Sequence, residues 1–141
     1  MADFVIDNSI VMAWCFDDEI STYADDVLGG LEVTAAIAPA IRPLELGNVP
    51  AVAEWRKRLN EADSIHFLAL IGDLPITVIQ EPAWRMTREI LALARKRQIS
   101  TYDPSYLDLA MRKGLPIATR DSGMKKAAMA CNVPMYNPAR M

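Results

Sequence analysis

Histidine and cysteine are scarce in this chain of 141 residues, which has one histidine and two cysteines. With His66 as the only histidine and no cluster of cysteines, the sequence argues against a zinc site and against a Ser-His-Asp triad. We interpret His66 as a residue on a helix face. Cys15 and Cys131 lie far apart within apolar helical patterns, so we expect two buried structural thiols rather than a disulfide.

Long apolar runs are also missing, because no run approaches the roughly 18 residues that span a bilayer. An apolar fraction of 52% and a mean hydropathy of +0.09 are typical of a globular protein. The length predicts one domain over residues 1–141, with a loose tail at about 137–141. The start, Met1-Ala2-Asp3, has no basic region of the kind found in signal peptides, so we expect a cytoplasmic protein.

Basic residues are absent from residues 1–41, which carry 8 of the 18 acidic residues; all 15 lysines and arginines lie in residues 42–141. This asymmetry favours an acidic pocket beside a surface that binds a polyanion. For any single Lys or Arg, however, a solvated helix face is the simpler interpretation. The candidate segments for phosphate binding are 56–58, 95–97, 112–113 and 125–126.

Apolar strand patterns alternate with helical ones, which predicts an α/β fold with a mainly parallel sheet. The expected strands are residues 4–6, 34–38, 76–79, 116–119 and 134–136. The expected helices are residues 10–16, a short one capped by Ser21, 40–59, 62–72, 84–97, 105–113 and 122–131. Pro50 should kink the third of these helices. Gly114 and Asn132 suit helix ends that need a left-handed residue.

Four acidic residues fall where such a sheet would gather them. Asp7 and Asp121 follow strands, whereas Glu45 and Asp103 lie near the starts of helices. Strand carboxyl ends and helix starts meet at one edge of a parallel sheet, so we expect these acids to converge. Clustered carboxylates repel one another unless a cation compensates them, and hard oxygen ligands favour Mg²⁺ or Mn²⁺. The chemistry indicated is metal-dependent phosphodiester hydrolysis.

Each acid also has a structural interpretation. Asp103 and Asp121, taken singly, are better explained as helix caps, and Glu45 as a partner of a helix dipole. Asp7, which ends an apolar strand, is the hardest to explain in this way. We expect Asp108 to lie on the surface, and Asp3 likewise.

Several segments in order resemble the PIN-domain family, in its VapC-type toxin branch. They are residues 4–9 (FVIDNS), 38–39 (AP), 44–48 (LELGN), 102–110 (YDPSYLDLA) and 118–121 (ATRD), and together they cover essentially the whole chain. Residues 102–110 are the most specific of them. The resemblance implies a parallel sheet of order 3-2-1-4-5 flanked by helices, a homodimer, and neutralisation by a small VapB-type antitoxin whose C-terminal segment enters the active-site groove.

The resemblance also implies roles for individual residues. Asp7, Glu45, Asp103 and Asp121 match the acidic quartet that holds Mg²⁺ or Mn²⁺ and activates water for RNA cleavage. Ser9 and Thr119 match hydroxyl residues beside the first and last acids. The sequence departs from the family pattern at Pro43 and Pro50, which flank Glu45 and affect how its helix approaches the site.

We therefore expect a Mg²⁺- or Mn²⁺-dependent endoribonuclease that is the toxin of a VapBC-type pair. Two alternatives remain. The first is a catalytically weak PIN-like module that binds RNA or protein. The second is a phosphatase or receiver-type domain with Asp7 as nucleophile, which the absence of an Asp-x-Asp motif at residues 7–9 disfavours.

Overall fold

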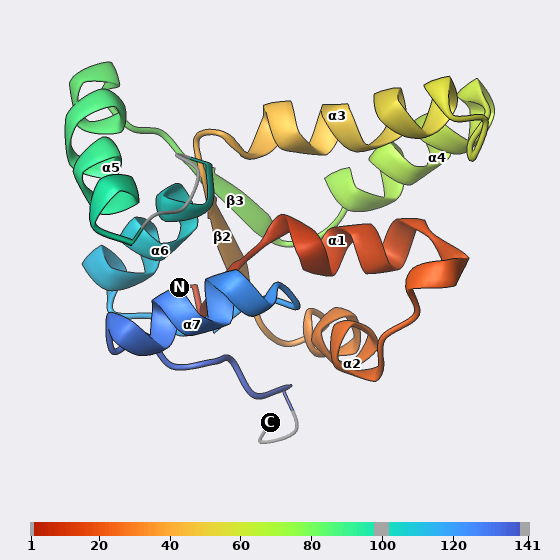
Figure 1. Cartoon of the computed structure of the whole chain (residues 1–141). Helices are drawn as coiled ribbons and strands as arrows, with labels where there is room; N and C mark the ends of the chain where they lie inside the picture. The colour runs from red at the N-terminus through yellow and green to blue at the C-terminus, as the bar shows by residue number, and fades with distance from the viewer. Residues whose placement is uncertain (1, 98–101, 139–141) are drawn as a thin grey trace.

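The computed structural model describes residues 2–97 and 102–138, with the backbone alone for Asp17, Arg97, Tyr102 and Asp103. The elements, in chain order, are β1 Phe4–Ile6, α1 Asn8–Cys15, the 3₁₀ turn η1 Asp17–Glu19, α2 Thr22–Gly30, β2 Ala36–Pro39, α3 Arg42–Trp55, α4 Glu61–Gly72, β3 Ile76–Ile79, α5 Ala83–Arg97, α6 Tyr102–Lys113, β4 Ile117–Ala118 and α7 Ser122–Ala130. Figure 1 shows helices on all sides of a small central sheet.

The described sheet has four strands in the order β3-β2-β1-β4, and every neighbouring pair is parallel. The predicted α/β class and the arrangement around β1 are confirmed. The expected fifth strand at residues 134–136 is reduced to one parallel bridge between Ile117 and Met135. That bridge lies beyond β4, where the fifth strand was expected, but β4 has only two residues and offers little edge to pair with.

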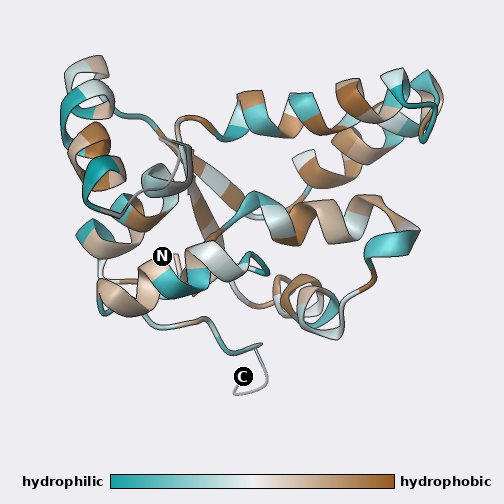
Figure 2. Ribbon diagram, viewed as in Figure 1, coloured by the Kyte–Doolittle hydropathy of each residue, from teal (hydrophilic) through white to brown (hydrophobic). Residues whose placement is uncertain are grey.

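The core forms around β1, whose three residues are fully buried. Strands covered on both faces read as continuous apolar runs, which is why FVI predicts this strand correctly. Figure 2 shows the hydrophobic colour on the strands of the interior, whereas the helices mix hydrophobic and hydrophilic positions. The ring of Phe4 stacks on that of Tyr136, with centroids 3.9 Å apart. This contact ties the segment after α7 to the first strand.

Local sequence signals explain most helix ends. Ser21 accepts a hydrogen bond from the amide of Ala24 and caps α2, as predicted. Gly114 and Asn132 both have positive φ angles, 64° and 60°, after α6 and α7. Helix α3 continues through Pro50, which is buried inside it. Proline has no amide hydrogen to donate, so this helix lacks one internal hydrogen bond there.

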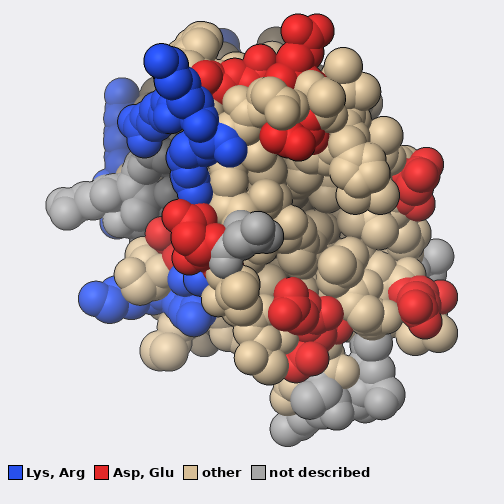
Figure 3. Space-filling model, turned by 90° about the vertical axis from the view of Figure 1, so that its right-hand side faces the viewer, with Lys and Arg blue, Asp and Glu red and all other residues tan. Residues whose placement is uncertain are grey.

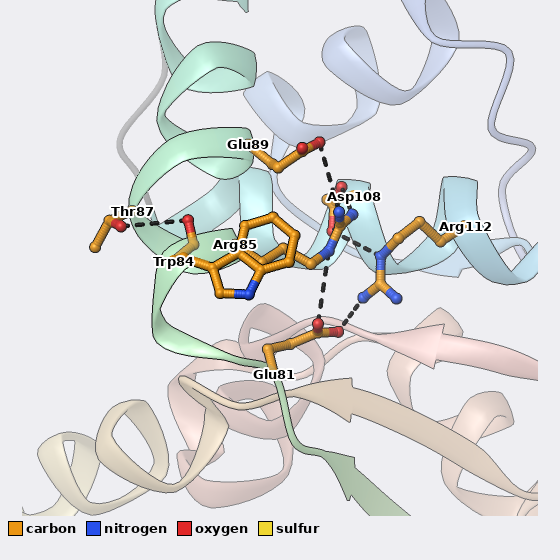
Figure 4. Close-up of polar contacts among 7 residues, drawn as sticks. All are labelled: Glu81, Trp84, Arg85, Thr87, Glu89, Asp108 and Arg112. Carbon is orange, nitrogen blue, oxygen red and sulfur yellow. Dashed lines mark hydrogen bonds and ion pairs between the residues drawn. The ribbon is translucent and has the colours of Figure 1, made fainter.

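The start of α6 and the place of Asp108 correct two expectations. The helix begins at Tyr102 and not at Ser105, so Asp103 and Pro104 lie within its first turn. Asp108 is not on the surface: its side chain is 15% exposed and pairs with Arg85 at 2.7 Å. Figure 4 shows this network, in which Arg112 joins Asp108 to Glu81. It fastens α5 to α6.

None of the helices among the described residues has both the length and the apolar composition needed to cross a bilayer.

Candidate functional site

Asp7 lies at the carboxyl end of β1 and is almost fully buried, with 5% of its surface exposed. Its backbone amide donates to the carbonyl of Ala118 on β4, which holds the residue at the sheet edge. The end of the central strand therefore carries a carboxylate at the edge where parallel sheets bind their ligands. Asp7 is also the residue before α1, although its side chain makes no capping hydrogen bond.

Two hydroxyl groups orient this carboxylate. Ser9 donates to Oδ2 of Asp7 at 2.8 Å, and Thr119 donates to the same oxygen at 2.7 Å. The hydroxyls lie 3.2 Å from each other, although their residues are 110 positions apart in the sequence. The sequence predicts these residues beside the site, and the structure brings them together. Both hydroxyls donate to one carboxylate oxygen, so they fix the direction of the Asp7 side chain.

The backbone after β4 is tied to the same cluster. The amide of Arg120 donates to Ser9 Oγ at 2.9 Å, and the amide of Asp121 donates to Thr119 Oγ1 at 3.1 Å. Asp121 itself caps α7, because its Oδ2 accepts the amide of Met124 at 2.7 Å. The residue is exposed. The structural interpretation of Asp121 thus holds, while its position two residues after Thr119 keeps it near Asp7.

Glu45 lies in the first turn of α3, half-buried, in spite of the neighbouring prolines. The hydroxyl of Tyr106 on α6 donates to its Oε1 at 2.6 Å. Burial, followed by the charge of Glu45, raises the pKa of Tyr106 well above its ordinary range, so this hydroxyl remains a donor. Pro43 occupies the start of the helix, where its missing amide hydrogen costs nothing. The turn that carries Glu45 is therefore well formed.

The sequence interpretation missed Arg42, whose side chain is only 2% exposed. Its Nη1 donates to the carbonyl of Ile6, the residue before Asp7, at 3.5 Å. Burial lowers the pKa of the guanidinium, and Tyr106, Glu45 and Asp7 oppose that shift. An arginine nevertheless remains charged in proteins, so a cation lies among these groups. The signal in the sequence was a lone arginine at the first position of a helix, where a cation is disfavoured.

A cleft of about 520 Å³ opens between α1 and α3 beside Glu45. Its floor is apolar and includes Met12, Phe16 and Val49. Arg56 and Arg58 lie at its far end, near the C-terminus of α3. The cleft therefore joins a carboxylate at one end to two guanidinium groups at the other.

The carboxylates of Asp7, Glu45 and Asp121 are the hard oxygen donors that suit Mg²⁺ or Mn²⁺. Within the described side chains, however, no three His, Cys, Asp or Glu residues come close enough to share a metal ion. The fourth predicted ligand, Asp103, has a side chain outside the described residues. The donor chemistry thus fits a divalent cation, while the described part alone does not assemble a three-ligand site.

The family model of the PIN domain matches residues 4–129. This chain belongs to the PIN-domain family. PIN domains are in general nucleases, and the predicted family and its fold are confirmed. A search of curated proteins gave no match to this PIN domain.

Two solved structures resemble the fold of this PIN domain. The crystal structure of PAE2754 from Pyrobaculum aerophilum is 23% identical, with a TM-score of 0.64, over 89% of this chain and 86% of its own. The crystal structure of FitAcB from Neisseria gonorrhoeae is 20% identical, also with a TM-score of 0.64, over 98% of this chain and 99% of its own. At such identities the likeness shows the fold alone.

The basic segments differ in how much charge they leave for a ligand. Arg112 is engaged by Asp108 and Glu81, and Arg58 pairs with Asp18 at 2.7 Å while its guanidinium lies over the ring of Phe16. The exposed lysines at 125 and 126 on α7 follow Asp121 closely. Figure 3 shows positive side chains gathered along one edge of the displayed face, with acidic ones spread over the rest.

Proposed function

We propose that this PIN domain is a metal-dependent endoribonuclease that hydrolyses RNA phosphodiester bonds, and that it is the toxin of a VapBC-type toxin–antitoxin pair. The observation that carries the proposal is the hydrogen-bonded Asp7 at the carboxyl end of the central strand, with Glu45 also beside the buried Arg42. The family supplies the reaction class, because PIN domains are in general nucleases.

The residues of the chain would divide the work as follows. Asp7, Glu45, Asp103 and Asp121 would hold Mg²⁺ or Mn²⁺, which lowers the pKa of a bound water and neutralises charge on the scissile phosphate. Ser9 and Thr119 fix the direction of the Asp7 carboxylate through their hydrogen bonds to Oδ2. The hydroxyl of Tyr106 orients Glu45 in the same way. These hydrogen bonds would orient the two carboxylates before substrate arrives.

Cleavage of RNA by the purified protein tests the proposal. Reactions would contain Mn²⁺, Mg²⁺ or EDTA, with Asp7→Asn beside the unchanged protein. We expect discrete products that require metal and that the variant does not form. The matched control is Asp26→Asn, which removes an exposed acid on α2 and should leave cleavage unchanged. Equal cleavage by Asp7→Asn, from preparations free of contaminating nuclease, contradicts the proposal.

A second candidate function is an RNA- or protein-binding module with little turnover. The buried Arg42 favours it, because a cation among the carboxylates competes with a metal. RNA binding that is unaffected by EDTA, with no products after long incubation, supports this alternative. Metal-dependent products exclude it.

We further propose a small antitoxin as partner, with the apolar cleft beside Glu45 as the groove that receives its C-terminal segment. The apolar lining of the cleft supports this occupant, and Arg56 beside it suits an acidic or carboxylate terminus. Protection of cleft residues from hydrogen exchange by an antitoxin peptide is the expected result. Protection confined to another surface contradicts the placement.

A homodimer is proposed from the family resemblance and from exposed apolar side chains of α3 and α4. Trp55 is 77% exposed, Ile65 63% and Leu68 39%. Apolar groups of this size favour burial against a second copy. We expect Ile65→Lys to convert a dimer into a monomer in light scattering. We also propose that residues 1–141 form one PIN domain and that the protein is cytoplasmic.

A further inference from the structure

Arg42 occupies a position that is unfavourable for a cation on two counts. It is the first residue of α3, and the N-terminus of a helix carries partial positive charge that repels cations. Its side chain is 2% exposed, and removing a charge from water is costly unless other charges compensate it. The positive charge of Arg42 therefore needs nearby negative or polar groups that offset both costs.

That compensation comes from the candidate site. The guanidinium donates to the Ile6 carbonyl and is hydrogen-bonded to the side chain of Tyr106, while Nε and Nη2 have no partner among the described residues. Its favourable electrostatic neighbours are Tyr106, Glu45 and Asp7. The last two are predicted metal ligands. The positive charge is therefore balanced by the same carboxylates that a divalent cation would use.

Building on the proposed nuclease function, we propose that Arg42 is a positioning residue that acts as the built-in counter-cation of the acidic site. It holds the side chains of Asp7 and Glu45 close together before a metal binds. The same charge repels a divalent ion, so this site binds Mn²⁺ or Mg²⁺ more weakly than its carboxylates alone would. An arginine that served only to pack α3 would leave metal affinity unaffected, and one that contacted substrate directly would have to be accessible to it.

Metal affinity of charge variants tests this role without relying on catalysis. Mn²⁺ binding would be measured by electron paramagnetic resonance and calorimetry on the full chain, for the unchanged protein, Arg42→Gln and Arg42→Lys. Glutamine keeps a donor for the Ile6 carbonyl but removes the charge, whereas lysine keeps the charge. Arg88→Gln, which removes an exposed charge from α5, is the control.

We expect Arg42→Gln to bind Mn²⁺ about tenfold more tightly than the unchanged protein, because one repelling charge is gone. Arg42→Lys and the control should stay near the original affinity. Equal Mn²⁺ affinity of the unchanged protein and Arg42→Gln overturns the proposed role of Arg42 as counter-cation. The nuclease proposal still stands in that case if RNA cleavage needs metal. Absence of Mn²⁺ binding from all variants overturns both.

Folding of Arg42→Gln supplies a second measurement. The variant leaves its carboxylates uncompensated without metal, so Mn²⁺ should raise its thermal midpoint more than that of the unchanged protein. If Arg42→Gln does not fold even with Mn²⁺, Arg42→Lys must still fold, because it keeps the charge. Failure of both variants overturns the proposal, since the shape of arginine and not its charge would then be required.

Discussion

Neutralising Asp7 should destabilise the metal-free protein, which is the opposite of what an uncompensated acidic cluster predicts. Carboxylates that repel one another are relieved when one becomes an amide, so Asp7→Asn would then raise stability. Here the buried Arg42 depends on Asp7 and Glu45 for compensation. Asparagine can still accept the hydrogen bonds of Ser9 and Thr119, so the change removes mainly charge.

The expected loss follows from the number of groups that compensate Arg42. Removing one partner of a buried ion pair costs about 3–5 kcal/mol. Glu45 and Asp7 are the two carboxylates that oppose the burial of Arg42, and Asp7 ranks second, so we expect less than half of that cost, about 1–2 kcal/mol. For a domain of this size the loss lowers the thermal midpoint by about 3–6 °C.

Urea and thermal unfolding in EDTA, followed by circular dichroism, measure this loss. Asp26→Asn, at an exposed position, is the matched control and should change stability by less than about 0.5 kcal/mol. In the Arg42→Gln background the Asp7→Asn change should become neutral or stabilising, which gives a coupling energy of about 1 kcal/mol or more. An unchanged or higher stability of Asp7→Asn alone refutes the reasoning.

Three further predictions concern other parts of the molecule. Tyr106→Phe removes the hydrogen bond to Glu45 and should cost about 1–2 kcal/mol of stability in urea unfolding. The cleavage rate should fall several-fold. Unchanged stability together with an unchanged rate contradicts the role of Tyr106 in orienting Glu45. Burial raises the pKa of Cys15 to about 11 from 9.0. In a Cys131→Ser variant at pH 8, alkylation of Cys15 should therefore be about 100-fold slower than that of an ordinary thiol, and the rate should increase with pH up to that pKa. A rate that levels off near pH 9 disproves the shift. Lys126→Gln should weaken RNA binding and reduce the salt slope of log K by about 0.7–0.9, measured by fluorescence anisotropy; an unchanged slope excludes that lysine from phosphate contact.

The amino-acid sequence alone determined the architecture and the place of Asp7 at the end of the central strand. The buried FVI run and the alternation of strand and helix patterns identify a parallel sheet, because local periodicity follows from which faces are buried. The position of Asp7 at a strand end predicts its place at the crevice, and Ser9 and Thr119 are found beside it. The predicted extent of the last strand, residues 134–136, was wrong, because pairing depends on the length of the edge that β4 offers.

Only the tertiary structure revealed how the charges are paired. Asp108 looks like a surface residue of a helix, yet it is engaged by Arg85 from another helix, 23 positions away. Arg42 looks like one more basic residue at the start of the basic part of the chain, yet folding encloses it next to Asp7 and Glu45. Helical periodicity reports which face of an element is buried, but it does not report which charges from distant elements meet there. That depends on how the elements pack, and packing brings together residues that the sequence keeps apart.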